Sequence, residues 1–377
     1  MSRSNDTGHF FQTTDSLATK ERKTAKSKNK NGNPIALPSK ILAIHADPFD
    51  DGAVFVAEAA GTARRVVLDS GDTSTVFTGA TAPLTSLAIS YSSSGSEPKI
   101  LFAGCWDKTI HSWSLSTRQP LRRYTNGHTD FVKCVLSFSL KGTSYLISGG
   151  ADANIIVWNV ASGAKLHVLK GHIRGILDLA IDPYSSSSEE IVLFSASSDR
   201  EIRSWKIMQT SAQEIAAPIL AHATSVNKLR FEGDVNSEGD LWTASADKTA
   251  AHLVRSRNWE SDTTLQHPDF VRDVVFSPQD NFVVTACRDE EVRVWNASSG
   301  DLAERGNRIV SVSIDGTVRV WSLEAEEVKR VREEAERAES GGVEVEGEEE
   351  KKKKKKEEGM LTAEEEAELA ELMEDDD

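Results

Sequence analysis

Hydrophobic and polar residues alternate along short segments from about residue 41 to residue 323, and turn residues separate these segments. In one unit the apolar segment YLISGG is followed by a tight turn that contains Asp152, and then by a second alternating segment, IIVWNV. A period of two with polar turns in between is typical of antiparallel strands joined as hairpins. The pattern therefore predicts a long series of β-hairpins.

An aspartate followed six residues later by a tryptophan recurs through the same region. Five copies keep both residues: Asp107/Trp113, Asp152/Trp158, Asp199/Trp205, Asp289/Trp295 and Asp315/Trp321. A further copy has Asp247 with Leu253 in the tryptophan position, and a degenerate first copy has Gly61 and Val67 at the two positions. A histidine precedes four of the aspartates at a similar interval, at positions 128, 172, 222 and 267. Self-similarity of this kind indicates a repeat architecture, here with seven copies.

These repeats resemble the WD-repeat family over about residues 41–323. The resemblance implies an all-β, seven-bladed β-propeller of four-stranded blades around a central channel. We assign it to residues 33–323, with an incomplete last blade. It also implies that a histidine, a strand Ser or Thr, the turn aspartate and the tryptophan form a hydrogen-bonded tetrad inside a blade. Three copies carry the complete tetrad: His128, Ser148, Asp152 and Trp158; His172, Ser195, Asp199 and Trp205; His267, Thr285, Asp289 and Trp295.

The other copies depart from this tetrad. The second has Ala103 at the hydroxyl position and no matching histidine, the fifth lacks the tryptophan, and the first keeps only His45. Ser, His and Asp are also the composition of a hydrolase triad. A catalytic site occurs once, however, whereas this set recurs three times with a tryptophan. We therefore interpret it as a structural device, in which hydrogen bonds make a buried carboxylate tolerable.

The last copy is too short. The interval from Trp295 to Trp321 is little more than half of the interval from Trp113 to Trp158 or from Trp158 to Trp205. The missing part corresponds to the histidine-bearing loop and the innermost strand of the last blade. Either this blade is incomplete or the sequence derives from a transcript or gene model that lacks a short exon, and we favour the second. An intact relative would then carry an extra histidine-containing strand between Glu304 and Arg308. We expect residues 33–40 to close the ring as the outer strand of the last blade.

The flanks differ from the repeats in composition. Formal net charge is −15, and most of it lies beyond residue 323. Residues 1–32 are expected to be a disordered basic arm, either a solvated tail or a nuclear-import or nucleic-acid-contacting segment. We expect an exposed charged helix at 324–340, a charged linker at 341–360 and an acidic amphipathic helix at 361–377. Leu369, Leu372 and Met373 form an apolar stripe on that last helix, which either binds a partner's groove or belongs to a solvated acidic tail.

No catalytic, phosphate-binding or metal-ligand motif is present, so we predict neither an enzyme nor a bound cofactor or metal. Three separate cysteines, no signal pattern and no membrane-length apolar run favour a reducing compartment, the cytoplasm or nucleus. The resemblance implies a monomeric scaffold or adaptor within a multiprotein complex. Alternatives are a substrate-recognition subunit in ubiquitin-dependent turnover, or an RNA- or ribosome-associated factor. On the face with the histidine loops and aspartate turns, the candidate partner-binding residues are Trp106, Phe131, Lys133, Arg174, Arg200, Phe270, Arg272 and Arg288.

Overall fold

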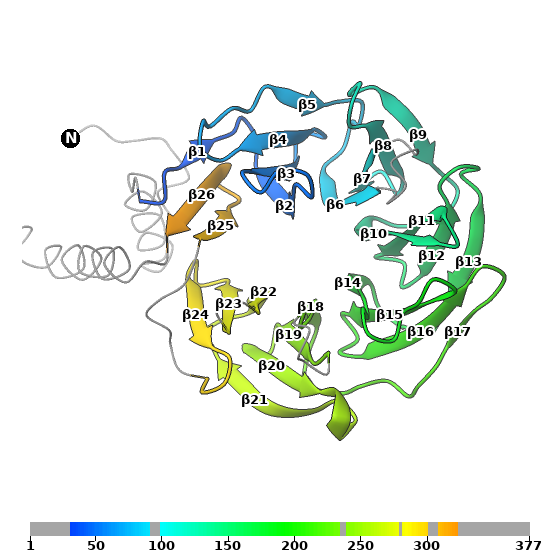
Figure 1. Ribbon diagram of the computed structural model, residues 1–377, viewed down its shortest axis with the longest axis vertical. Helices are drawn as coiled ribbons and strands as arrows, with labels where there is room; N and C mark the ends of the chain where they lie inside the picture. Colours follow the sequence, from blue (N-terminus) through cyan, green and yellow to red (C-terminus); the bar gives the residue numbers. More distant parts are fainter. Residues whose placement is uncertain (1–30, 91–98, 234–238, 279–280, 301–307, 323–377) are drawn as a thin grey trace, which may run out of the picture. The chain divides into compact units, whose positions relative to one another are not determined.

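The computed structural model describes residues 31–90, 99–233, 239–278, 281–300 and 308–322. Within them the chain forms 26 β-strands and one short 3-10 helix, η2 (Arg255–Arg257). The strands make seven antiparallel sheets, arranged as the blades of a ring (Figure 1). The predicted seven-bladed, all-β propeller is therefore confirmed. In the described part of the chain, no helix combines the length and the apolar character that a membrane span requires.

Five blades have four strands each, ordered from the ring axis outward as they follow one another along the chain. Blade 1 contains β2 (Ile41–Ala46), β3 (Ala53–Glu58), β4 (Ala63–Val67) and β5 (Thr75–Phe77). Blade 2 contains β6 (Leu84–Ser90), β7 (Ile100–Cys105), β8 (Ile110–Ser114) and β9 (Pro120–Tyr124). Blade 3 contains β10 (Val132–Leu140), β11 (Thr143–Gly150), β12 (Ile155–Asn159) and β13 (Lys165–Leu169).

Blade 4 contains β14 (Ile176–Ile181), β15 (Glu190–Ser197), β16 (Ile202–Met208) and β17 (Ala212–Glu214). Blade 5 contains β18 (Val226–Phe231), β19 (Leu241–Ser245), β20 (Thr249–Val254) and β21 (Glu260–Gln266). The last two blades have three strands each among the described residues. Blade 6 contains β22 (Val271–Ser277), β23 (Phe282–Cys287) and β24 (Val292–Asn296), and blade 7 contains β25 (Arg308–Val312), β26 (Thr317–Ser322) and β1 (Ile35–Ala36).

The inner strands of blades 1 to 6 share one irregularity. In each, the pairing with the second strand shifts between the first and the third residue, as between Ile176 and Asp178 in blade 4. Such a shift is a β-bulge. Where the residue inside the bulge is polar, it can reach the next blade. Thr85 donates a hydrogen bond to the Val132 carbonyl over 2.6 Å, and Asn227 does the same to the Val271 carbonyl.

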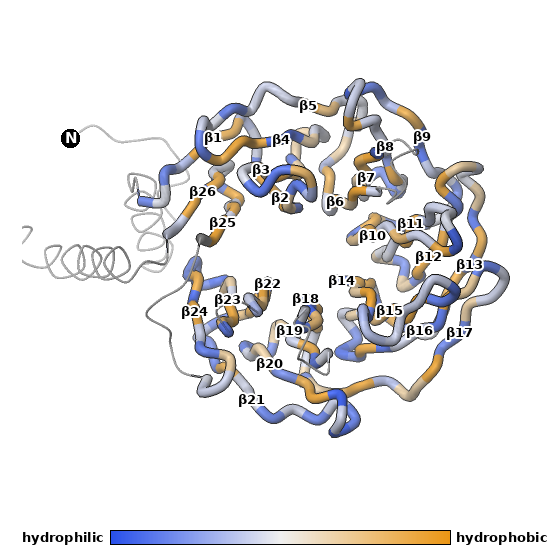
Figure 2. The backbone as a smooth tube through the Cα atoms, viewed as in Figure 1, coloured by the Kyte–Doolittle hydropathy of each residue, from blue (hydrophilic) through white to orange (hydrophobic). Residues whose placement is uncertain are grey.

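The hydrophobic core lies largely between neighbouring blades. The first and fourth residues of an inner strand pack with the residue three positions after the turn aspartate of the preceding blade. Ile155 of blade 3 thus shares a buried cluster with Ile176 and Leu179 of blade 4. Figure 2 shows hydrophobic residues recurring along the inner strands of successive blades. Each blade therefore depends on the next one to cover its apolar side.

A tight turn with a fixed conformation joins the second and third strands of each blade. The aspartate accepts a hydrogen bond from the N–H two residues later, for example Glu201 to Asp199 at 3.0 Å, which is an Asx-turn. The residue between them is left-handed, with φ of 71° at Arg200 and 81° at Gly61. In blade 1, this places Ala60 in the aspartate position and Val66 in the tryptophan position. The assignment of Gly61 and Val67 to these positions was thus wrong by one residue.

Blades 3 and 4 contain the full hydrogen-bonded tetrad. In blade 4 the indole N–H of Trp205 donates to Ser195 Oγ over 2.9 Å, and Ser195 Oγ lies 2.8 Å from His172 Nε2. His172 Nδ1 lies 2.9 Å from Asp199 Oδ2. A neutral imidazole with its proton on Nδ1 satisfies all three contacts, because the hydroxyl then donates to Nε2. Blade 3 repeats the geometry with His128, Ser148, Asp152 and Trp158.

Blade 6 differs from the prediction. Thr285 binds both His267 and Trp295 at 2.8 Å, but His267 Nδ1 faces the Leu265 carbonyl at 3.1 Å, and Asp289 pairs with Arg293 at 2.7 Å. In blade 4 the equivalent arginine, Arg203, binds a glutamate of the outer strand β17. No outer strand of blade 6 lies within the described residues. Arg293 binds Asp289 instead, so the tetrad predicted for this blade lacks its contact between His267 and Asp289.

The other departures have individual solutions. In blade 2 the indole N–H of Trp113 donates to the Thr78 carbonyl over 2.7 Å, because Ala103 offers no hydroxyl. In blade 5 His222 still bridges Asp247 and Thr243, with Leu253 buried in the place of the tryptophan. His45 is not the tetrad histidine of blade 1. It lies within the inner strand β2, whereas the tetrad histidines precede their inner strands by four residues.

The N-terminal segment closes the ring. β1 pairs antiparallel with β26 through Ile35 opposite Val318 and Ala36 opposite Thr317, so it is the outer strand of blade 7, the role expected for residues 33–40. Further backbone bonds of 2.7 Å run from Leu37 N–H to the Gly316 carbonyl and from Val320 N–H to the Gly32 carbonyl. Among the described residues no strand pairs with the axial edge of β25.

The two aspartate environments give a test of the tetrad. Asp199→Ala leaves the buried Nδ1–H of His172 and the backbone N–H groups of Ile173 and Glu201 without their acceptor, so we expect it to lower the free energy of unfolding by about 3 kcal/mol. Asp289→Ala removes a carboxylate that binds Arg293 near the surface, and we expect a loss of about 1 kcal/mol. Urea denaturation at pH 7 measures both values. Equal losses would contradict this account of blade 6.

Stability should also depend on pH in a defined direction. Burial lowers the pKa of His172 and of His267, so the folded chain resists the proton that the unfolded chain takes up at about pH 6.5. Burial alone would raise the pKa of Asp199, but hydrogen bonds from Glu201, Ile173 and His172 outweigh it and lower it. The stabilisation that the buried neutral histidines give to the folded state is therefore complete above pH 6.5 and is lost as pH falls. The stabilisation from the aspartate is lost only below about pH 4. The free energy of unfolding should fall between pH 7 and pH 5.

Two histidine variants with opposite effects serve as matched controls. His172→Gln should lower stability at pH 7 but flatten its decline toward pH 5. Burial alone would lower the pKa of His252, but the Glu232 carboxylate 3.1 Å away and the hydrogen bond with Asp262 outweigh it and raise it. The charged His252 therefore stabilises the fold at low pH and loses that effect as pH rises, so His252→Gln should make the decline steeper. A change of slope in the same direction for both variants would refute the assignment.

Candidate protein-interaction face

The histidine loops and the aspartate turns meet at one end of each complete blade. In each of blades 1 to 6 the residue before the turn aspartate position donates its N–H to the carbonyl of the residue before the inner strand, over 2.8 to 3.0 Å. These pairs are Ala59/Lys40, Trp106/Pro83, Ala151/Phe131, Ser198/Gly175, Ala246/Ser225 and Arg288/Phe270. We call the surface formed by these loops and turns the His-loop face. The turn aspartates of blades 3, 4 and 5 fix the backbone of this face, because each accepts the N–H of the residue after its histidine.

An exposed aromatic pair stands on this face at the boundary of blades 2 and 3. The rings of Trp106 and Phe131 stack with centroids 5.2 Å apart and an interplanar angle of 17°. They nevertheless remain 47% and 40% exposed. The side chain of Asp130 accepts the N–H of Phe131 at 2.8 Å and so helps to fix its backbone. Two large rings held in place before any partner arrives are the type of anchor that contributes most at protein interfaces.

Ile173 is a further exposed residue on this face, which the sequence interpretation missed. It follows His172 directly, its N–H donates to Asp199 at 3.0 Å, and it is 82% exposed. Thr129 and Ala223 occupy the same position in blades 3 and 5, with the same bond to their aspartates. The sequence did contain a signal for Ile173, because it is a large apolar residue at a position where the other blades have small or polar residues.

The remaining candidates on this face are cationic, apart from Phe270. Arg174, Arg200, Arg272 and Arg288 are exposed, and Lys133 is half-buried in its inner-strand bulge. Arg288 lies over the ring of Phe270, 5.3 Å from its centroid, and 4.0 Å from Asp269. The structure therefore brings together Trp106 with Phe131 and Arg288 with Phe270. It shows no direct contact between these two pairs.

Lys108 and Lys248 should be added to this cationic set. Both are exposed and follow a turn aspartate in the left-handed conformation, with φ of 70° and 73°, like Arg200. The turn exposes the residue after the aspartate in blades 2, 4, 5 and 6, whereas Gly316 in blade 7 is buried. The repetition of this turn in the sequence would have sufficed to identify these two lysines.

Within the described part of the chain, three groups of side chains contain atoms of the kind that bind metals. They are Cys105, Asp107 and His111; His172, Asp199 and Glu201; and Glu232, Asp240 and His252. The second belongs to the tetrad of blade 4. In the first, burial raises the pKa of Cys105 to about 11, so the thiol stays protonated at neutral pH and is a weak ligand. Asp107 in the same group already accepts hydrogen bonds from Thr109 and Arg123.

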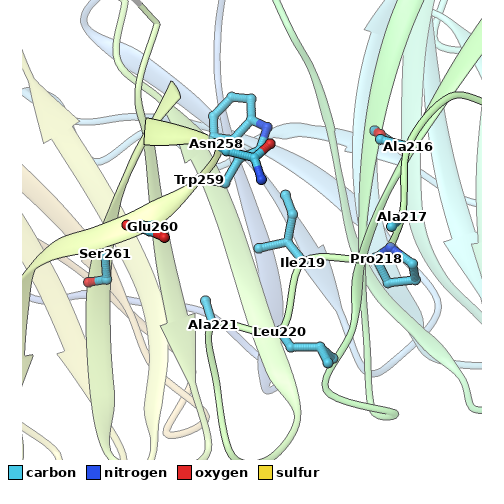
Figure 3. A pocket seen from close by; sticks show the side chains of 11 residues that line it. Ala216, Ala217, Pro218, Ile219, Leu220, Ala221, Asn258, Trp259, Glu260 and Ser261 are labelled. Carbon is cyan, nitrogen blue, oxygen red and sulfur yellow. The ribbon is translucent and has the colours of Figure 1, made fainter. Parts of the chain in front are cut away.

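A hollow of about 490 Å³ lies on the outer side of the ring between blades 4 and 5 (Figure 3). The segment after β17, from Ala216 to Ala221, forms one wall and residues 258–261 form the other. Leu220 is 62% exposed at this site. The only titratable side chain in the lining is Glu260, so the hollow offers no acid–base pair.

The buried serines argue against hydrolase chemistry in the tetrads. Ser148 and Ser195 are 0% exposed, and each hydroxyl is occupied by an indole and an imidazole. A substrate cannot reach these oxygens without unfolding the blade. Among the described residues the three cysteines are also buried and free. The expected stripe of Leu369, Leu372 and Met373, the helices at 324–340 and 361–377, the linker at 341–360 and all but the last two residues of the arm 1–32 lie outside the described residues.

Comparison with known proteins agrees with this architecture. The family model for the WD domain, G-beta repeat, matches residues 71–114, 118–159, 163–206, 259–296 and 300–322. A WD repeat-containing protein of Schizosaccharomyces pombe is 32% identical, with 99% of this chain and all of the relative aligned. The alignment spans 395 positions, more than the 377 residues of this chain, so that relative carries at least 18 positions without a counterpart here.

Other relatives are similar over a part of their length. Pre-mRNA-processing factor 19 of Mus musculus is 26% identical over 53% of this chain and 38% of its own length. Nuclear distribution protein PAC1 of Arthroderma otae is 29% identical over 48% of this chain and 38% of its own length. The ring of blades, the matched repeats and the full-length similarity to the fission-yeast protein agree, and the chain belongs to the WD-repeat family.

Proposed function

We propose that this protein is a non-catalytic scaffold or adaptor subunit, and that its His-loop face binds other proteins. The observation that carries the proposal is the stacked pair of Trp106 and Phe131, which is ordered by the fold and yet exposed. Propellers of this family generally act as interaction platforms. The tetrads support that role, because they fix the loops that present the face.

The exposed cations of the His-loop face indicate the chemistry of the proposed partner. Lys108 and Arg200 are exposed on the same turns that hold the face. A partner that combines an apolar or aromatic anchor with carboxylates would therefore match the surface. We propose a nuclear or cytoplasmic location, supported by the names of two relatives, a pre-mRNA-processing factor and a nuclear distribution protein.

Substitution of the aromatic pair tests the proposal. Trp106→Ala combined with Phe131→Ala should weaken binding of face-dependent partners roughly 30-fold, about 2 kcal/mol, as expected for a hot spot. Because both side chains are exposed, the melting temperature should change little. Quantitative affinity purification with mass spectrometry from cells expressing the tagged variant measures the loss of partners.

The outer strands provide a matched control. Leu121 in β9 and Leu166 in β13 are 51% and 40% exposed, away from the His-loop face. The double variant Leu121→Ala and Leu166→Ala removes comparable exposed apolar groups and should retain the partners. If both double variants lose the same partners, or neither loses any, the His-loop face is not the binding site.

A further inference from the structure

One apolar position is buried in every blade except blade 6. The residue three positions after the turn aspartate position is at most 1% exposed in six blades: Ala63, Ile110, Ile155, Ile202, Ala250 and Val318. Its equivalent in blade 6, Val292, is 43% exposed. Val275 in the inner strand β22 is 48% exposed, whereas Ala88 and Ala180 at the same strand position are 2% and 9% exposed. The described residues therefore leave the side of blade 6 that faces blade 7 uncovered.

The other blades show what covers this position. Ile110 shares a cluster with Val132 and Val135, the first and fourth residues of the next inner strand. The same relation holds between Ala250 and the pair Val271 and Val274. All six inner strands have Ile, Leu or Val at both positions. By comparison with these blades, Val292 lacks a neighbouring inner strand with branched apolar residues at its first and fourth positions to pack against it.

The chain between blades 6 and 7 is too short to provide that strand. A connection from the third strand of one blade to the second strand of the next runs, for example, from Val67 to Ile100 or from Val254 to Phe282. The connection from β24, which ends at Asn296, to β25, which begins at Arg308, is less than half as long as any of the others. This short segment would have to supply the outer strand of blade 6, a histidine loop and an inner strand.

Blade 7 also holds an unfinished tetrad. Trp321 donates its indole N–H to Ser311 Oγ over 2.8 Å, as the tryptophans do to their hydroxyls in blades 3, 4 and 6. In those blades the hydroxyl then donates to a histidine, but no histidine is near Ser311 among the described residues. Ile314 directly precedes Asp315. In blades 1 to 6 the N–H at this position donates to the carbonyl of the residue before the inner strand, but the described residues offer no such carbonyl to Ile314. Ile314 is 66% exposed.

A missing exon would supply this strand from the chain itself. For the chain with the short connection present in this sequence, we propose that an extended segment of a partner protein completes blade 7 by pairing antiparallel with the axial edge of β25. The uncovered Val292 and the unfinished tetrad indicate the sequence that the partner segment needs. It should contain a histidine, three intervening residues, and then a strand with Ile, Leu or Val at its first and fourth positions. By analogy with blade 4, where Leu179 lies opposite Ser195, the fourth residue lies opposite Ser311 and the fifth opposite Val310. This site is distinct from the His-loop aromatic pair, so the proposal stands independently of the proposed function.

The full-length protein and a synthetic peptide test this proposal. The probe is the chain's own sequence 266–277, QHPDFVRDVVFS, in which His267, Val271 and Val274 have the required spacing. We expect saturable one-to-one binding by calorimetry and a rise in melting temperature. A peptide with aspartate in place of both valines should not bind. Nor should a peptide N-methylated at the amides that would face β25, because strand addition needs backbone hydrogen bonds. Lack of binding by the unmodified peptide at millimolar concentration would overturn the proposal.

Protein variants then locate the site. Val292→Asp changes an exposed side chain, so it should leave the fold intact, checked by circular dichroism, and abolish peptide binding. Replacing the peptide histidine with alanine should weaken binding about tenfold to the native protein but have little effect on binding to Ser311→Ala, because both changes remove the same hydrogen bond. Binding unaffected by Val292→Asp, or additive losses in the second comparison, would refute strand insertion at blade 7.

Discussion

Each blade of this propeller has an apolar side that only the next blade can cover. Ile155 is buried because Ile176 and Leu179 pack on it, and the same three-residue contact recurs around the ring. The β-bulge at the start of each inner strand makes the contact feasible, because it places the first and fourth residues on one side. Stability is therefore a property of consecutive pairs of blades, and a missing strand affects two blades at once.

The repeat was readable from the sequence because its key residues have a physical reason to recur. The turn aspartate is needed for the Asx-turn, and the alternation of apolar residues places one side of each strand in the core. The tetrads in blades 3 and 4 followed from the family resemblance, once its pattern was carried over to these residues position by position. The closing strand was also predictable, because the resemblance implies an N-terminal strand in the last blade and residues 33–40 are a short apolar stretch just before the first blade.

Other features depended on neighbours that a linear reading does not show. Asp289 is in the expected place but binds Arg293, while His267 faces the Leu265 carbonyl. His45 has the expected residue type but sits inside β2, where no turn aspartate can reach it. In blade 1 the degenerate turn left no aspartate to align, and only the left-handed Gly61 marks the register. Exposure of Ile173 or Val292 is likewise a three-dimensional property, although comparison between blades could have drawn attention to both.

The closing contact between β1 and β26 has a consequence for the order of folding during synthesis. Arg319 binds the backbone carbonyl of Asn31, 288 residues away along the chain. Hairpins within a blade can form as soon as they leave the ribosome, but blade 7 cannot acquire its outer strand until nearly all of the propeller has been translated. Until β26 has been synthesised, the backbone donors and acceptors of β1 that pair with it have no partner strand. Such late, long-range pairing slows folding and exposes strand edges to aggregation, so this nascent chain should depend on chaperones until its final blade is made.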